Sequence, residues 1–101
     1  MKYGLQGSFI AVEGRGDKLA SVLLEAAGLM QNAEGCLHYI VGQYEDDPDR
    51  IYIHEVWESK EHHDHSLNLE GVGELISMAR PLIKDKPKSV SINILGGTGL
   101  D

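Results

Sequence analysis

Residues 51–57 read IYIHEVW, with large apolar or aromatic side chains at both odd and even positions. Successive side chains of a strand point to opposite faces of a sheet, so a strand with one face in water alternates between apolar and polar residues. Residues 39–41, which read YIV, also lack this alternation. The two stretches therefore predict a sheet that is covered on both faces.

The neighbouring segments predict the element order β-α-β-β-α-β. Alternation and β-branched residues indicate strands at 2–13, 37–44, 51–57 and 89–95. Helically spaced apolar residues indicate one helix that Asp17 caps and that ends after Met30. A second helical region begins at a Ser59 cap and reaches Ile83, with a break at Gly71. The turn residues DDPD at 46–49 separate the second strand from the third.

This order is typical of an α+β, ferredoxin-like fold of the split βαβ type. In that fold the helices cover one face of a four-stranded antiparallel sheet, and the other face needs a separate cover. The two-sided apolar strands therefore predict that the sheet of an identical subunit packs against the helix-free face. The 101 residues fit one domain, 1–101, with a flexible glycine-rich tail at about 96–101.

Composition argues against several classes of partner. A formal net charge of −7 repels the phosphates of nucleic acids and the headgroups of anionic membranes. A single cysteine, Cys36, makes no intrachain disulfide, and no secretory signal or membrane-length apolar run is present. We therefore expect a cytoplasmic protein. Three lysines at 84, 86 and 88 alternate with Asp85 and Pro87, which is typical of a solvated loop.

The most informative motif is Glu55-x-Trp57-x-Ser59-x-Glu61, which runs into a histidine-rich helix. Together with the element order and the Glu-Gly turn before the strand that begins near Cys36, this motif resembles the antibiotic biosynthesis monooxygenase superfamily over nearly the whole chain. The resemblance implies a homodimeric α/β barrel, in which two ferredoxin-like protomers pack sheet against sheet. It also implies oxidation of a phenolic or quinol-like compound by molecular oxygen without flavin, haem or metal.

Such a reaction requires a site that excludes water, holds an aromatic ring and accepts the phenolic proton. Trp57 with Tyr39 or Tyr52 is the predicted aromatic wall. Glu55, on the same strand face as Trp57, is a predicted pocket residue with a catalytic role. Two structural alternatives stay open. Trp57 could be an ordinary core residue, and Glu55 could serve a structural hydrogen bond or ion pair.

Members of the family often carry a histidine nine residues after the tryptophan, and Ser66 stands at that position here. His62, one helical turn before Ser66, and His65, immediately before it, are the predicted proton acceptors in its place. Ser66 itself is a predicted pocket residue. The alternative for His62, His63 and His65 is a solvated helix surface.

Three further functions are weighed against a cofactor-independent monooxygenase. A non-catalytic dimer that binds a small hydrophobic ligand would share the fold, because fold alone does not confer activity. A haem-degrading enzyme would need an axial histidine and usually an asparagine on the first strand, whose uncharged polar side chains are Gln6 and Ser8. A metal site at His62, His65 and His54 lacks an anionic ligand and any known spacing, so we expect no cofactor.

Overall fold

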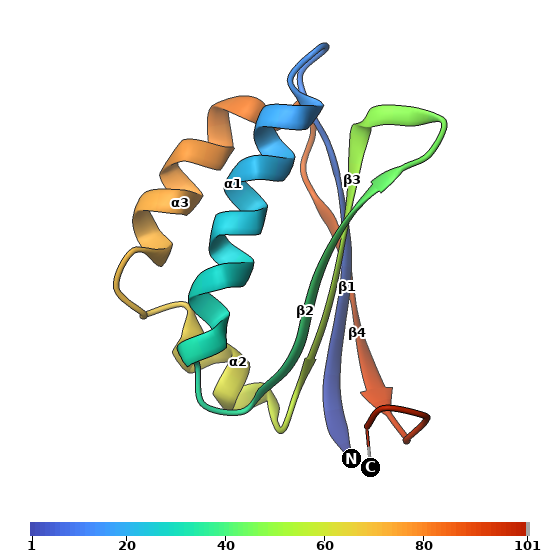
Figure 1. Ribbon diagram of the computed structural model, residues 1–101, viewed down its shortest axis with the longest axis vertical. Coiled ribbons are helices and arrows are strands. Elements are labelled where there is room, and N and C mark those ends of the chain that lie inside the picture. The colour runs from blue at the N-terminus through green and yellow to red at the C-terminus, as the bar shows by residue number, and fades with distance from the viewer. Residues whose placement is uncertain (101) are drawn as a thin grey trace.

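The computed structural model describes residues 1–100 and consists of two layers, an antiparallel sheet and a layer of helices on one of its faces (Figure 1). The elements, with η for a 3₁₀ turn, are β1 (Lys2–Ile10), α1 (Gly16–Leu29), η1 (Met30–Asn32), β2 (Cys36–Tyr44), β3 (Asp47–Trp57), α2 (Lys60–Ser66), α3 (Val72–Ala79), η2 (Arg80–Leu82) and β4 (Lys88–Ile94). The strand order is β2-β3-β1-β4. This confirms the α+β split βαβ prediction. In the described part of the chain, no helix combines the length and apolarity needed to cross a membrane.

Two predicted strand boundaries differ from the structure by more than one residue. β1 ends at Ile10 instead of Glu13, because Ala11 leaves the sheet to form an isolated bridge with Ile83. β3 begins at Asp47, so the hairpin turn is shorter than the predicted turn at 46–49. The pairing of β2 with β3 shifts at Tyr44, and Pro48 lies in this irregular part, where its missing N–H removes no regular ladder hydrogen bond.

The start of α1 is capped from a distant strand and not by Asp17. The carboxylate of Asp49 accepts hydrogen bonds from the backbone N–H of Gly14 at 3.0 Å and of Gly16 at 2.9 Å. Gly16 is required there, since a Cβ at this position would lie 1.9 Å from the carbonyl oxygen of Pro48. Asp17 instead accepts a hydrogen bond from the Gln43 side chain at 2.9 Å. The predicted cap is therefore wrong, although an acidic residue does cap the helix.

The two faces of β3 have different surroundings. Its odd-numbered residues from Ile51 to Trp57 are buried beneath the helices, and they pack with a core from α1 and α3 that includes Leu19, Val22, Leu23, Leu75 and Ala79. The register with β1 and β2 places Tyr52 and His54 on the opposite face, which no helix covers. Apolar side chains gather on this helix-free face, which includes Ile40, Val56, Val90, Ile92 and Ile94.

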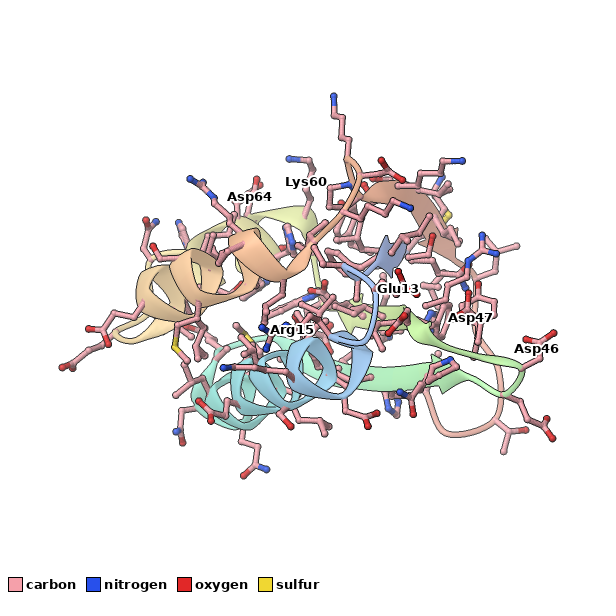
Figure 2. The ribbon with its side chains drawn as sticks, turned by 90° about the horizontal axis from the view of Figure 1, so that it is seen from above. Glu13, Arg15, Asp46, Asp47, Lys60 and Asp64 are labelled. Atoms are coloured by element: carbon pink, nitrogen blue, oxygen red, sulfur yellow. The ribbon has the colours of Figure 1, made fainter. Side chains whose placement is uncertain are left out.

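The Asp49 cap predicts a measurable loss of stability on its removal. Asp49→Ala removes the acceptor for the N–H of Gly16, the first residue of α1, and of Gly14 in the turn before it, so we expect the free energy of unfolding to fall by about 1–2 kcal/mol. Urea denaturation measures this loss. Asp46→Ala is the matched control, because Asp46 is exposed at the tip of the hairpin (Figure 2). Equal losses in the two variants would contradict the cap.

Candidate functional site

A cavity of about 540 Å³ lies between the sheet and the helices. Its volume is typical of small-molecule pockets, which range from roughly 300 to 1,000 Å³. Most of its walls are apolar side chains of α1, β3 and α3. The polar groups in the wall come from two places. One set comes from β2, β3 and α2 and consists of Tyr39, Glu55, His63 and Ser66. The other set follows α3 and consists of Arg80, Lys84 and Asp85.

Glu55 is a buried carboxyl group with a buried hydrogen-bond donor. Its side chain shares a strand face with Trp57, whose indole Nε1–H donates to Oε1 of Glu55 at 3.0 Å. Glu55 is 7% exposed and Trp57 is fully buried. Burial raises the pKa of Glu55, and the hydrogen bond from Trp57 and the nearby His63 oppose this rise. Glu55 therefore holds a proton more readily than an ordinary glutamate does.

His63 lies between two carboxylates and two aromatic rings. Its Nε2 is 3.9 Å from Oε1 of Glu55, and its Nδ1 is 3.0 Å from Oδ1 of Asp64. The ring packs edge-on against Trp57 with centroids 5.8 Å apart and tilts against Tyr3 at 5.5 Å. With a proton on Nδ1, the imidazole donates to Asp64 and leaves Nε2 as an acceptor on the side of Glu55.

Asp64 is in turn held by Lys60, one helical turn earlier on α2 (Figure 2). The Lys60 ammonium lies 2.9 Å from Oδ2 of Asp64. The hydrogen bonds from Lys60 and then from His63 lower the pKa of Asp64, so this carboxylate stays ionised as the acceptor for Nδ1 of His63. Both partners are exposed, so the pair adds little to stability. Its effect is on the orientation of His63.

Tyr39 and Ser66 complete the polar part of the wall as hydrogen-bonding groups. Tyr39 pairs with Glu55 across the β2–β3 ladder. Burial, followed by the negative charges of Glu55 and Cys36, raises the pKa of Tyr39, so its hydroxyl stays protonated and can donate a hydrogen bond. The buried Ser66 hydroxyl donates to the backbone carbonyl of His63. Neither group is suited to accept a substrate proton.

Two of the predicted aromatic wall residues lie elsewhere. Trp57 does not line the cavity, because it packs with Met30 and Val72 in a smaller core cluster beyond Glu55. The core alternative for Trp57 describes its position. Tyr52 lies on the helix-free face, as its even number in the strand requires. Tyr39, Glu55 and Ser66 do line the cavity, and their roles in binding or catalysis stay predictions.

The two histidines predicted as proton acceptors do not reach the cavity. Nδ1 of His62 is 2.7 Å from the Ser59 hydroxyl at the start of α2, and its ring lies against Gly35. His65 is exposed on the outer side of the helix. The histidine that does line the cavity is His63. Its spacing from Ser66 could have indicated this, because positions i and i+3 share a helix face and Ser66 was already a predicted pocket residue.

The alternative metal ligands are not brought together either. His54 lies on the helix-free face with its Nδ1 3.2 Å from the Gln6 amide, whereas His62 and His65 belong to α2 on the other side of the sheet. Within residues 1–100, no three His, Cys, Asp or Glu side chains are grouped so that they could hold a metal ion.

The raised pKa of Glu55 predicts a pH-dependent gain in stability for Glu55→Gln. The folded protein keeps this proton at pH values where the unfolded chain has lost it, so wild-type stability falls as pH rises from about 4.3 through the raised pKa. A glutamine oxygen still accepts the Trp57 hydrogen bond without burying a charge. We expect the variant to melt higher than wild type at neutral pH and the difference to shrink toward pH 4. Thermal denaturation across this range measures it.

The exposed Glu58→Gln variant is the control for a general effect of removing one negative charge. A melting difference for Glu55→Gln that is independent of pH would contradict the buried, proton-holding carboxyl group.

The chain is similar to several known proteins. The family model for antibiotic biosynthesis monooxygenase matches residues 3–76. A solved structure from Chloroflexus aurantiacus, described as a putative antibiotic biosynthesis monooxygenase, is 40% identical, with both chains fully covered and a TM-score of 0.85. SnoaB from Streptomyces nogalater, described as a cofactor-independent oxygenase, is 14% identical over 96% of each chain with a TM-score of 0.80, which shows the shared fold. No functionally curated protein matches. The chain belongs to the antibiotic biosynthesis monooxygenase family.

Proposed function

We propose that this protein is a cofactor-independent monooxygenase that oxidises a phenolic or quinol-type aromatic molecule with molecular oxygen. The observation that carries the proposal is the position of His63 and Glu55 in the wall of a largely apolar cavity. Membership of a monooxygenase family supports it, as does the shared fold with one oxygenase that is described as cofactor-independent.

The first step is removal of the phenolic proton. Nε2 of His63 accepts it, because Nδ1 already donates to Asp64 and thereby fixes the tautomer. Glu55, 3.9 Å from Nε2, stabilises the resulting imidazolium or takes the proton on. Tyr39, which keeps its own proton, donates a hydrogen bond to the developing phenolate.

The phenolate then supplies the electrons that reduce O₂, so no separate reductant is needed. One-electron transfer to O₂ gives a substrate radical and superoxide, which combine at a ring carbon that bears a hydrogen. The resulting peroxide anion takes the proton held by His63 and becomes a hydroperoxide. Loss of water from the hydroperoxide leaves a quinone carbonyl, so one oxygen atom enters the product and the other leaves as water. The apolar walls of the cavity exclude solvent water from these intermediates.

The mechanism predicts that two histidines of one helix differ in importance. His63→Gln removes the proton acceptor, so we expect kcat to fall by about 10²–10⁴-fold. His65→Gln is the matched control, because His65 lies on the same helix but is exposed outside the cavity. Oxygen uptake with a panel of quinols and naphthols measures both. Equal rates for His63→Gln and wild type would remove His63 from the mechanism.

A non-catalytic, small-molecule-binding protein is the second candidate, and Ser66 favours it. The resemblance places a histidine at this position in many relatives, whereas here the serine hydroxyl is used in a hydrogen bond within α2. Titration calorimetry beside the oxygen-uptake panel separates the two functions. Binding of quinols or naphthols without any oxygen uptake would favour the binding protein and contradict the monooxygenase.

We also propose that the protein works as a homodimer through its helix-free sheet face. That face carries exposed apolar side chains, with Val90 61% and Ile40 50% exposed in the single chain. A second copy presents the same surface, so a two-fold axis lets the apolar strands of one sheet cover those of the other. The dimer would also cover Tyr52, which is partly exposed on this face of β3.

The dimer predicts opposite outcomes for two exposed apolar residues. Val90→Glu buries an uncompensated carboxylate in the interface, at a cost of roughly 3–5 kcal/mol for each charge, so we expect light scattering to report a monomer. Met78→Glu is the control, because Met78 is 50% exposed on α3, on the helix side of the molecule. A wild-type protein that scatters as a monomer at micromolar concentration would contradict the dimer.

A further inference from the structure

Positive charge is concentrated in one short segment of this acidic chain. Residues 80–88 hold four of the nine basic residues and one of the sixteen acidic residues, a net charge of +3. The rest of the chain holds the other five basic and fifteen acidic residues, a net charge of −10. The segment comprises η2 and the connection to the start of β4. It follows α3 and therefore lies along one border of the cavity.

Two of these four basic residues belong to the cavity wall. Arg80 and Lys84 line the cavity, and Lys86 and Lys88 do not. All three lysines are exposed, as the prediction of a solvated loop requires, and Lys84 borders the cavity as well. Within residues 1–100, neither Arg80 nor Lys84 forms an ion pair with a carboxylate of the chain. Asp85 also lines the cavity, but the three side chains together still carry one net positive charge.

The basic part of the wall lies far from the polar groups around Glu55. The backbone N–H of Lys84 donates to the carbonyl of Ile10, at the end of β1, whereas Glu55 pairs with Leu5. Five residues of strand separate these positions, which corresponds to about 16 Å. Figure 1 shows the same separation, with α2 near one end of the sheet and the end of α3 near the other. Apolar wall residues occupy the space between.

We infer that the cavity selects an elongated substrate with a phenolic ring at the Glu55 and His63 end and a carboxylate at the Arg80 and Lys84 end. The position of the ring rests on the proposed function, and the position of the carboxylate rests on the charges of residues 80–88. A guanidinium group matches a carboxylate in geometry and binds it with two parallel hydrogen bonds. The negative charge on the rest of the chain repels an anion. Arg80 and Lys84 therefore also orient the carboxylate of the substrate as it enters the cavity.

The test compares one acid with its neutral analogue. The probes are a hydroxynaphthalene that bears a propanoate chain and the primary amide of the same molecule, titrated into the full protein by calorimetry. We expect wild type to bind the acid about tenfold more tightly than the amide at low ionic strength. The difference should shrink as salt is added, because the basic side chains are exposed to solvent.

Two double variants locate the effect. Arg80→Gln with Lys84→Gln should lower the affinity for the acid to that for the amide and leave the affinity for the amide unchanged. Lys86→Gln with Lys88→Gln removes the same charge from the same segment outside the cavity wall, so it should keep the preference. A preference lost equally in both double variants would reflect the general field of the segment and overturn the assignment to Arg80 and Lys84.

Failure of this inference and failure of the proposed function look different. If wild type binds the acid and the amide equally well, the carboxylate end is wrong and the phenolic end stands. If neither compound binds while simple quinols are still oxidised, the elongated substrate is wrong and the monooxygenase stands. If no phenolic compound binds or is oxidised, the proposed function and this inference fall together.

Discussion

The hydrogen bond between the Trp57 indole and Glu55 is the interaction on which the site depends. A carboxyl group buried under helices loses its hydration, which is costly unless donors or charges compensate for it. Trp57 provides the donor from two residues along the same strand, at 3.0 Å, and His63 provides the second polar neighbour. The fully buried Trp57 thereby acts on the cavity wall indirectly, by holding the oxygen of Glu55 that faces His63.

Successive side chains of β3 point to opposite faces of the sheet, so one strand contributes residues to two surfaces. Odd-numbered residues build the core and the site, and the even-numbered Tyr52 and His54 contribute to the helix-free face. Glu55 is thus preceded in sequence by His54, which lies on the face of the proposed dimer interface. A second sheet packed on that face would restrict movement of the strand that carries Glu55, which links assembly to the geometry of the site without any contact between the partner and the cavity.

Periodicity predicted the element order, because it reports which side chains share a face. It failed where a contact between distant segments decided the outcome. Asp49 caps α1 from another strand, and no local window around Asp17 contains that information. The phase of the short helix α2 was also ambiguous among its histidines. It is fixed by the bond between Ser59 and His62, which turns His63 toward the cavity. The position of Arg80 and Lys84 in the cavity wall was not predictable either, because it depends on the path of the chain between α3 and β4.

The seven residues of α2 are too few for a stable isolated helix, so side-chain bonds must hold the segment. The Ser59 hydroxyl accepts from the backbone N–H of His62 at its start, and the Ser66 hydroxyl donates to the carbonyl of His63 near its end. The backbone on either side of His63 is therefore held by a serine hydroxyl. The imidazole of His63 lies between Asp64 on the surface and Glu55 in the interior. A serine at position 66 fits the proposed mechanism: if His63 accepts the proton, position 66 needs no base, and its hydroxyl ties the end of the helix.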